Sequence, residues 1–224
     1  DRSNFTAVSS IVRSGAVVLD VGANIGIYSS VMSVLVGEAG QVHSFEPVRH
    51  IRQKARLNIA MNGGRNVTMN AFALGEAPGE LEMMQVKEGI YRGGTSTFVQ
   101  NNNIREMGAD KFSKEKVRIS TIDEYCAGFS RLDFIKMDIE GFELPALRGA
   151  RGTMQRLGPV ILFEHDKPRL GGLGLDEADF ADLFAGTGYT CFEIFMSDGE
   201  ATMARYNFDR KMRGNNLLAL KLGD

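Results

Sequence analysis

The segment Val17–Gly26, which reads VVLDVGANIG, constrains the fold of this chain more than any other part of the sequence. Its apolar first half is typical of a buried β-strand, and Gly22 interrupts that strand immediately after Val21. Apolar residues then recur at helical spacing, so we expect a helix over residues 25–36. A strand, a glycine-rich turn and the N-terminus of a helix together form a cradle for a nucleotide-like cofactor, because backbone N–H groups point at the ligand there.

The carboxylate of Asp20 indicates which cofactor this cradle would hold. The pattern is Asp-x-Gly-x-Asn-x-Gly rather than the Gly-x-Gly-x-x-Gly of dinucleotide-binding folds. Asp20 would repel a diphosphate, whereas S-adenosyl-L-methionine (SAM) has no phosphate and carries an ammonium and a sulfonium group that a carboxylate attracts. The sequence therefore favours SAM, and an NAD-dependent oxidoreductase fits the glycine pattern poorly. The expected cofactor-binding residues of this segment are Asp20, Gly22, Ala23, Asn24 and Gly26.

Two further strand ends are expected to complete the cofactor site. Glu46 ends a predicted strand over residues 41–46, which Pro47 stops, and it follows Asp20 by 26 residues. Nucleotide-binding folds place an acid at roughly this offset against the ribose hydroxyls, so we expect Glu46 and Pro47 to contact the cofactor. At the end of a third predicted strand, over residues 67–74, Ala73 and Leu74 could flank the adenine ring, and core packing is an equally good interpretation of them.

Polar residues at the ends of two buried strands are expected to form the reaction centre. Asp138 ends a strand over residues 133–138, and Glu164 and His165 follow a strand over residues 160–164. In open α/β sheets ligands bind at the carboxyl ends of the strands, so these side chains should meet there. We expect Asp138 to hold the substrate or the methionine ammonium group, His165 to accept a proton, and Glu164 to orient His165 or hold the substrate.

The same carboxylates leave a metal-assisted mechanism open. Asp138, Glu140 and Glu164 together could offer oxygen ligands to Mg²⁺, but we favour a site without metal. Glu140 and Glu143 could instead cap the helix predicted over residues 143–157, because a helix N-terminus favours negative charge.

Alternating strands and helices predict one α/β domain over residues 1–224, with a doubly wound, mostly parallel sheet. We expect an N-terminal helix over residues 1–14 and an antiparallel sheet edge built from strands over 189–195 and 217–222. Residues 87–116 form a loop-rich insertion before a short strand over 117–120. This insertion and the loop-rich segment 196–214 should shape the acceptor pocket, because specificity resides largely in loops.

Charge and cysteine content exclude several classes of partner. The net charge is -2 and the isoelectric point is near 6.0, so the chain has no general attraction for nucleic acids or anionic membranes. This slightly acidic composition also argues against an RNA methyltransferase, which needs a basic surface to bind RNA. Cys126 and Cys191 are far apart in sequence and form no disulfide or metal pattern, which favours a reducing, cytoplasmic compartment. The longest uncharged stretch, Val21–Gly37, is too short and too polar to span a membrane.

Taken together, VLDVGANIG, SFEP, FIKMDIEGFE and ILFEH resemble the FkbM-type SAM-dependent methyltransferases, in the right order over about residues 15–168. Gly94–Thr97 and Asn215–Ala219 are also similar, whereas residues 87–116 do not match closely. The resemblance implies a class I methyltransferase fold with seven strands and O-methylation of a hydroxyl on a sugar or natural-product intermediate. It also implies roles by position: Asp20, Gly22, Asn24, Gly26, Glu46 and Ala73 would serve the cofactor, and Asp138, Glu164 and His165 would lie nearest the methyl group.

The expected partner is therefore a small hydroxylated acceptor, and a homo-oligomer is compatible with the sequence. A SAM-binding module without catalytic activity is the alternative, although the charged groups at the sheet rim argue against it.

Overall fold

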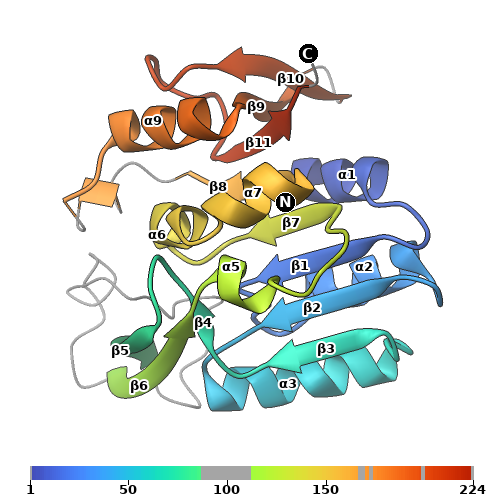
Figure 1. Ribbon diagram of the computed structural model, residues 1–224. Coiled ribbons are helices and arrows are strands. Elements are labelled where there is room, and N and C mark those ends of the chain that lie inside the picture. Colours follow the sequence, from blue (N-terminus) through green and yellow to red (C-terminus); the bar gives the residue numbers. More distant parts are fainter. Residues whose placement is uncertain (1, 87–111, 166–169, 172–173, 198–199, 223–224) are drawn as a thin grey trace.

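The computed structural model describes residues 2–86, 112–165, 170–171, 174–197 and 200–222 of the chain (Figure 1). Its strands are β1 (Val17–Val21), β2 (Gln41–Phe45), β3 (Val67–Asn70), β4 (Ala73–Leu74), β5 (Gly79–Val86), β6 (Phe112–Ser120), β7 (Phe134–Met137), β8 (Val160–Glu164), β9 (Tyr189–Ser197), β10 (Glu200–Tyr206) and β11 (Asn216–Lys221). Its helices are α1 (Arg2–Ile11), α2 (Ile27–Val36), α3 (Arg49–Met61), α5 (Ile122–Tyr125), α6 (Glu143–Arg148), α7 (Arg151–Leu157) and α9 (Glu177–Thr187).

The central sheet has the strand order β10-β9-β11-β8-β7-β1-β2-β3. The run from β8 to β3 is parallel, whereas β11 lies antiparallel between β8 and β9, and β10 pairs antiparallel with β9. The mostly parallel α/β architecture agrees with the prediction. The described sheet has eight strands rather than seven, because β10 arises within the segment that was predicted to be loop-rich. The antiparallel edge strand is therefore β10, and β11 is an inner strand.

Helices cover both faces of this sheet, as Figure 1 shows. On one face, Val8 of α1, Val12 just after α1 and Met32 of α2 form a core with the β1 residue Val18. On the other face, α5, α6, α7 and α9 pack on side chains such as Leu19. Successive residues of a strand point to opposite faces, so Val18 and Leu19 of β1 are buried in the cores on the two sides of the sheet. Because β1 is packed on both faces, its carboxyl end is held rigidly at the edge of the sheet. Among the described residues, no helix is long and apolar enough to span a membrane.

A second, three-stranded sheet has the order β4-β6-β5. The strand predicted over residues 67–74 is divided, because the chain bends at Ala71 and Phe72 and β4 leaves the central sheet to pair with β6. β6 begins at Phe112 rather than at residue 117, and its longer pairing with β5 was hidden by the polar sequence SKEK. The rest of the predicted insertion, residues 87–111, lies outside the described residues.

The helix predicted over residues 143–157 is two helices, α6 and α7, separated at Gly149 and Ala150. A side chain at Gly149 would place its Cβ 2.0 Å from the carbonyl oxygen of Gly75, so this break packs directly on another backbone segment. The carboxylate of Asp123 accepts hydrogen bonds from the backbone N–H groups of Gly152 and Thr153, at 2.9 and 2.6 Å, and thereby caps α7.

Candidate cofactor site and reaction centre

The glycine-rich turn after β1 is fixed against the two neighbouring strands. Gly22, Asn24 and Gly26 have positive φ angles of 79°, 50° and 81°. The N–H groups of Gly22 and Ala23 donate to the carbonyl oxygen of Phe45, at 3.1 and 2.9 Å. A Cβ at Gly22 would lie 2.0 Å from the carbonyl oxygen of Asp138, so only glycine fits. The turn is therefore locked between the ends of β2 and β7, where the sequence predicted a cofactor cradle.

Glu46 is held beside this turn by backbone groups. Its Oε2 accepts from the N–H of Asn24 at 3.1 Å, and its Oε1 accepts from the N–H of Val48 at 2.9 Å. Burial raises the pKa of Glu46 to about 7, although these two hydrogen bonds and the charge of Arg52 oppose the shift. Each carboxylate oxygen has a second lone pair, so Glu46 retains the capacity to accept hydrogen bonds from two ribose hydroxyls.

Asp20 lies fully buried beneath the turn, which the sequence did not reveal. Its Oδ2 accepts from the hydroxyl of Ser29 at 2.6 Å, and Ser29 in turn accepts from the hydroxyl of Ser44 at 2.8 Å. Its Oδ1 lies 3.6 Å from Nζ of Lys136 and has no hydrogen-bond partner among the described residues. A buried carboxylate is costly unless it is paired, so Lys136 is the counter-ion that permits Asp20 at this position.

Lys136 is the residue of the site that sequence reasoning missed. Its ammonium group lies 3.6 Å from both Asp20 and Asp138, 3.4 Å from the carbonyl oxygen of Gly22, and 4.8 Å from the ring centroid of Tyr28. Burial by itself would lower the pKa of Lys136, but the two carboxylates outweigh burial and raise it, so the group stays charged. A lysine in the otherwise apolar run FIKM was the signal that could have identified it.

Asp138, immediately after β7, is the accessible carboxylate of this cluster. Its side chain is 45% exposed, whereas that of Lys136 is 6% exposed. Glu143, at the start of α6, is instead buried and accepts from the N–H of Ile139 at 2.8 Å. Burial raises the pKa of Glu143 to about 8, and the nearby charges of Glu164 and Asp138 add to the shift. Asp138 is therefore the group of this cluster that can meet a bound ligand directly.

Glu164 and His165 follow each other at the end of β8 but have different surroundings. Glu164 is partly exposed, and its Oε1 accepts from Nδ2 of Asn215 at 3.4 Å. The side chain of His165 is 0% exposed, and its Nε2 lies 3.3 Å from Oε1 of Glu177 on α9. Its ring packs edge-on against Phe180 and Phe208, with centroids 5.0 and 5.6 Å apart. The structure thus encloses His165 in an aromatic cluster, away from solvent, which the sequence did not predict.

The residues predicted to flank adenine are also buried. Ala73 and Leu74 lie on β4 and pack in separate core clusters of the second sheet and the main sheet. At the bend before them, Ala71 is exposed and Phe72 is partly exposed. Phe72 packs edge-on against Phe45, with ring centroids 5.5 Å apart. Because this bend follows the carboxyl end of β3, Ala71 and Phe72 are better placed than Leu74 to border a ligand at the sheet edge.

No group of three or more histidine, cysteine or acidic side chains in the described part of the chain is arranged to hold a metal ion. The oxygen ligands considered for Mg²⁺, Asp138, Glu140 and Glu164, are therefore not brought together as a metal site. The ion pair between Lys136 and Asp138 is a further reason, because the ammonium group occupies the place where a cation would balance the charge.

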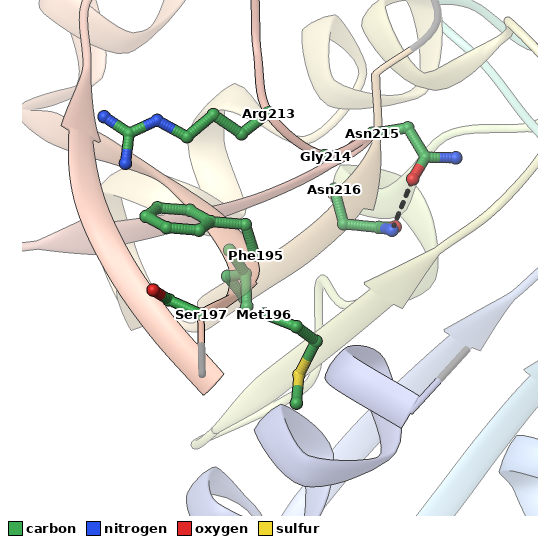
Figure 2. A pocket seen from close by; sticks show the side chains of 8 residues that line it. Phe195, Met196, Ser197, Arg213, Gly214, Asn215 and Asn216 are labelled. Carbon is green, nitrogen blue, oxygen red and sulfur yellow. Dashed lines mark hydrogen bonds between the residues drawn. The ribbon is translucent and has the colours of Figure 1, made fainter. Parts of the chain in front are cut away.

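A separate hollow lies at the end of β9, as Figure 2 shows. It has a volume of about 490 Å³, and β9 and the segment before β11 form it. Its lining residues are Ile194, Phe195, Met196, Ser197, Arg213, Gly214, Asn215 and Asn216.

Comparison with known proteins identifies the family. Residues 20–191 match the methyltransferase FkbM domain. The chain belongs to this family. Its fold is similar to the crystal structure of methyltransferase FkbM from Methylobacillus flagellatus KT, with a TM-score of 0.54, 19% sequence identity, and coverage of 92% of this chain and 44% of that one. The sequence prediction of an FkbM-type, class I methyltransferase fold is thereby confirmed.

Two curated relatives extend the comparison. AMB antimetabolite synthetase AmbE of Pseudomonas aeruginosa is 27% identical over 214 residues, which cover 80% of this chain but only 10% of that protein. Protein-L-isoaspartate O-methyltransferase of Methanothrix thermoacetophila is 40% identical over 58 residues, or 26% of this chain and 28% of the relative. The chain thus spans between 10% and 28% of the length of these two relatives.

The chain carries a methyltransferase FkbM domain, and the geometry at the glycine-rich turn fits SAM as the cofactor. The buried Asp20 Oδ1 has an unused hydrogen-bonding capacity next to the glycine-rich turn. Glu46 faces the same turn with lone pairs available for hydroxyl donors. Asp138 presents an exposed carboxylate on the other side. These acceptors suit a ligand that carries hydroxyl and cationic groups and no phosphate.

Proposed function

We propose that this protein transfers the methyl group of SAM to a hydroxyl oxygen of a small molecule. The observation that carries the proposal is the exposed carboxylate of Asp138 at the carboxyl end of β7, 3.6 Å from the buried Lys136. A hydroxyl must lose its proton as its oxygen is methylated, so a proton acceptor is needed beside the methyl group. The name of the O-methyltransferase relative from Methanothrix thermoacetophila agrees with an oxygen acceptor.

SAM supplies an electrophilic methyl group when it is bound, and the residues of the chain supply position and charge. Glu46 would accept hydrogen bonds from the ribose hydroxyls. Lys136 holds the carboxylates of Asp20 and Asp138 in fixed positions, so neither group must reorganise during the reaction. Asp138 would accept the hydrogen bond of the acceptor hydroxyl and then its proton, which solvent removes later. Glu164, partly exposed at the end of the adjacent strand, would hold another polar group of the acceptor.

The proton-accepting role predicted for His165 requires its ring to reach the acceptor. In the described structure the ring is enclosed by α9 and the aromatic cluster, and it contacts Glu177. We therefore place Asp138 ahead of His165 in this role. His165 would instead hold the end of β8 against α9.

The test is a methyl-transfer screen with SAM labelled with ¹³C in its methyl group, over hydroxylated sugars and metabolites. The chemical shift of the labelled product distinguishes an O-methyl from an N-methyl or C-methyl group. Asp138→Asn should lower kcat by roughly 100-fold with little change in SAM affinity, in the range typical of a lost general base. His165→Gln should leave kcat within about threefold, as expected for a residue outside the reaction.

Three outcomes would contradict the proposal. Labelled N-methyl or C-methyl products would show that the acceptor atom is not oxygen. Normal turnover of Asp138→Asn with loss of turnover in His165→Gln would return the proton-accepting role to His165. SAM binding without methyl transfer to any acceptor of the screen would favour the non-catalytic binding module.

A further inference from the structure

The hollow at the end of β9 lies on the same edge of the sheet as the reaction centre. β9 is antiparallel to β11, and β11 is antiparallel to β8, so the carboxyl ends of β8 and β9 point the same way. Asn216, which lines the hollow, pairs in register with both Glu164 and Ile194. Neighbouring strands are about 4.8 Å apart, so β9 lies roughly 14 Å from β7, the strand that positions Asp138. A metabolite-sized acceptor could span that distance.

The charged residue among those that line the hollow is Arg213, which belongs to a positively charged cluster with Glu193 and Arg210. The carboxylate of Glu193 is fully buried and accepts from Arg210 NH2 at 2.5 Å and from the backbone N–H of Arg213 at 3.0 Å. Burial alone would raise the pKa of Glu193, but these bonds and the two guanidinium charges lower it, so it is ionised. One carboxylate thus faces two guanidinium groups, and a net charge of about +1 remains. At the centre, by contrast, the carboxylates of Asp20, Asp138 and Glu164 outnumber the one ammonium group.

Arg213 presents this charge to the hollow. Its side chain is 61% exposed, and its Nε is 3.8 Å from the nearest Glu193 oxygen, so the carboxylate does not engage it by a short hydrogen bond. The guanidinium carbon lies 4.5 Å from the centroid of the Phe195 ring, and Figure 2 shows the two groups next to each other. This cation–π contact helps to order the guanidinium group, whose planar fork can bind an acidic oxygen group bidentately.

The backbone fixes the shape of this site. A Cβ at Gly214 would lie 2.7 Å from the carbonyl oxygen of Ile194, so the segment before β11 approaches β9 as closely as glycine permits. The same approach places the side-chain amides of Asn215 and Asn216 at the rim, where Nδ2 of Asn216 lies 3.4 Å from Oδ1 of Asn215 (Figure 2). The guanidinium group of Arg213 suits an acidic oxygen group, because a planar fork matches a carboxylate or phosphate. The amides of Asn215 and Asn216 border the hollow and already donate to Glu164 and Asn215, respectively.

We propose that this hollow binds a negatively charged group of the methyl acceptor, a carboxylate or a phosphate, about 14 Å from the strand that carries Asp138. The inference rests on the proposed function and narrows it: the acceptor is a hydroxylated acid or phosphate ester rather than a neutral sugar. An anion held at Arg213 stays away from the carboxylate of Asp138, which would repel it. Its binding also orients the acceptor hydroxyl towards Asp138.

The test titrates ¹⁵N-labelled protein, saturated with S-adenosyl-homocysteine, with inorganic phosphate, gluconate and neutral glucose. The arginine Nε–H and asparagine side-chain signals are followed by NMR. We expect phosphate or gluconate, but not glucose, to shift the Arg213 and Asn215 signals with a millimolar Kd. Arg213→Gln should weaken that binding at least fivefold, and Arg213→Lys less so. Arg151→Gln, which changes an exposed arginine on α7, should leave it unchanged. The phosphate and gluconate arms distinguish the two anionic groups.

SAM titration of the same proteins separates a failure of the anion site from a failure of the proposed function. Normal SAM binding with no anion-dependent shift at Arg213, or with equal anion affinity in Arg213→Gln and Arg151→Gln, would overturn the anion site and leave the proposed function standing. Failure of the unmodified protein to bind SAM would overturn the proposed function itself. If Arg213→Gln does not fold, Arg213→Lys decides the question, since unchanged affinity for both anions would then exclude a bidentate contact.

Discussion

Replacing Glu46 with glutamine should remove the pH dependence that this residue gives to SAM binding. The carboxylate can accept ribose hydroxyl bonds strongly only when it is ionised, and burial raises its pKa to about 7 in the free protein. With that pKa, the ionised fraction is about 0.9 at pH 8 and about 0.09 at pH 6. SAM affinity of the unmodified protein should therefore fall about tenfold between pH 8 and pH 6.

The size of the loss at pH 8 follows from the hydrogen bonds involved. A hydrogen bond to a charged group contributes about 1.5–3 kcal/mol, and the glutamine oxygen retains a weaker one, so we expect a net loss of about 2 kcal/mol. This corresponds to a Kd about 30-fold higher in Glu46→Gln at pH 8. At pH 6 the difference between the two proteins should shrink to about threefold, because the Glu46 carboxyl is then largely protonated.

Isothermal titration calorimetry at pH 6, 7 and 8 measures both quantities. The ammonium group of SAM also titrates, but its contribution is common to both proteins and cancels in their ratio. The reasoning would be refuted if Glu46→Gln retained the tenfold fall in affinity, since another group would then be responsible. It would equally fail if the substitution left the Kd at pH 8 unchanged, because Glu46 would not contact the cofactor.

Three further predictions follow from buried groups near the same site. Burial raises the pKa of Glu143 from 4.5 to about 8, so the folded state holds a proton that the unfolded state releases, and the free energy of unfolding should fall as pH rises from about 4.5 to 8. In urea unfolding, Glu143→Gln should reduce this dependence on pH and be more stable than the unmodified protein at pH 8 by at most about 4 kcal/mol. The same dependence on pH in both proteins would contradict this prediction. Gly22→Ala combines a φ of 79° with a Cβ only 2.0 Å from a carbonyl oxygen, so it should lower Tm and weaken SAM binding at least tenfold. Gly128→Ala should do neither, because a Cβ at Gly128 would have no atom within 4 Å. Equal effects of the two substitutions would contradict the steric argument. Lys136→Met leaves the buried carboxylate of Asp20 without its counter-ion and should destabilise the protein by about 3–5 kcal/mol in urea unfolding. A loss below about 1 kcal/mol would show that Asp20 does not depend on Lys136 as its counter-ion.

The sequence by itself determined the features that depend on local pattern. The strand, turn and helix over residues 17–36 could be predicted because apolar periodicity and positive-φ residues act within a few positions of each other. The same logic placed Glu46, Asp138 and Glu164 at strand ends, and parallel topology then requires those ends to share one edge. The α/β class and the preference for SAM followed from these patterns, whereas the FkbM family followed from the resemblance of the combined motifs to known methyltransferases.

The tertiary structure decided which of those residues face a ligand and which are enclosed. Lys136 lies two residues before Asp138, but nothing near it in the sequence shows that Asp20, on the neighbouring strand β1, also faces it. His165 lies one residue after Glu164, yet its ring is covered by α9 and by residues around β10, an edge strand whose single buried face leaves a weak sequence pattern. β4 leaves the main sheet because β6, more than 35 residues later, offers it a parallel partner. Each of these outcomes depends on contacts between distant segments, and long-range pairing is set by how whole elements pack rather than by the residues next to each other in the chain.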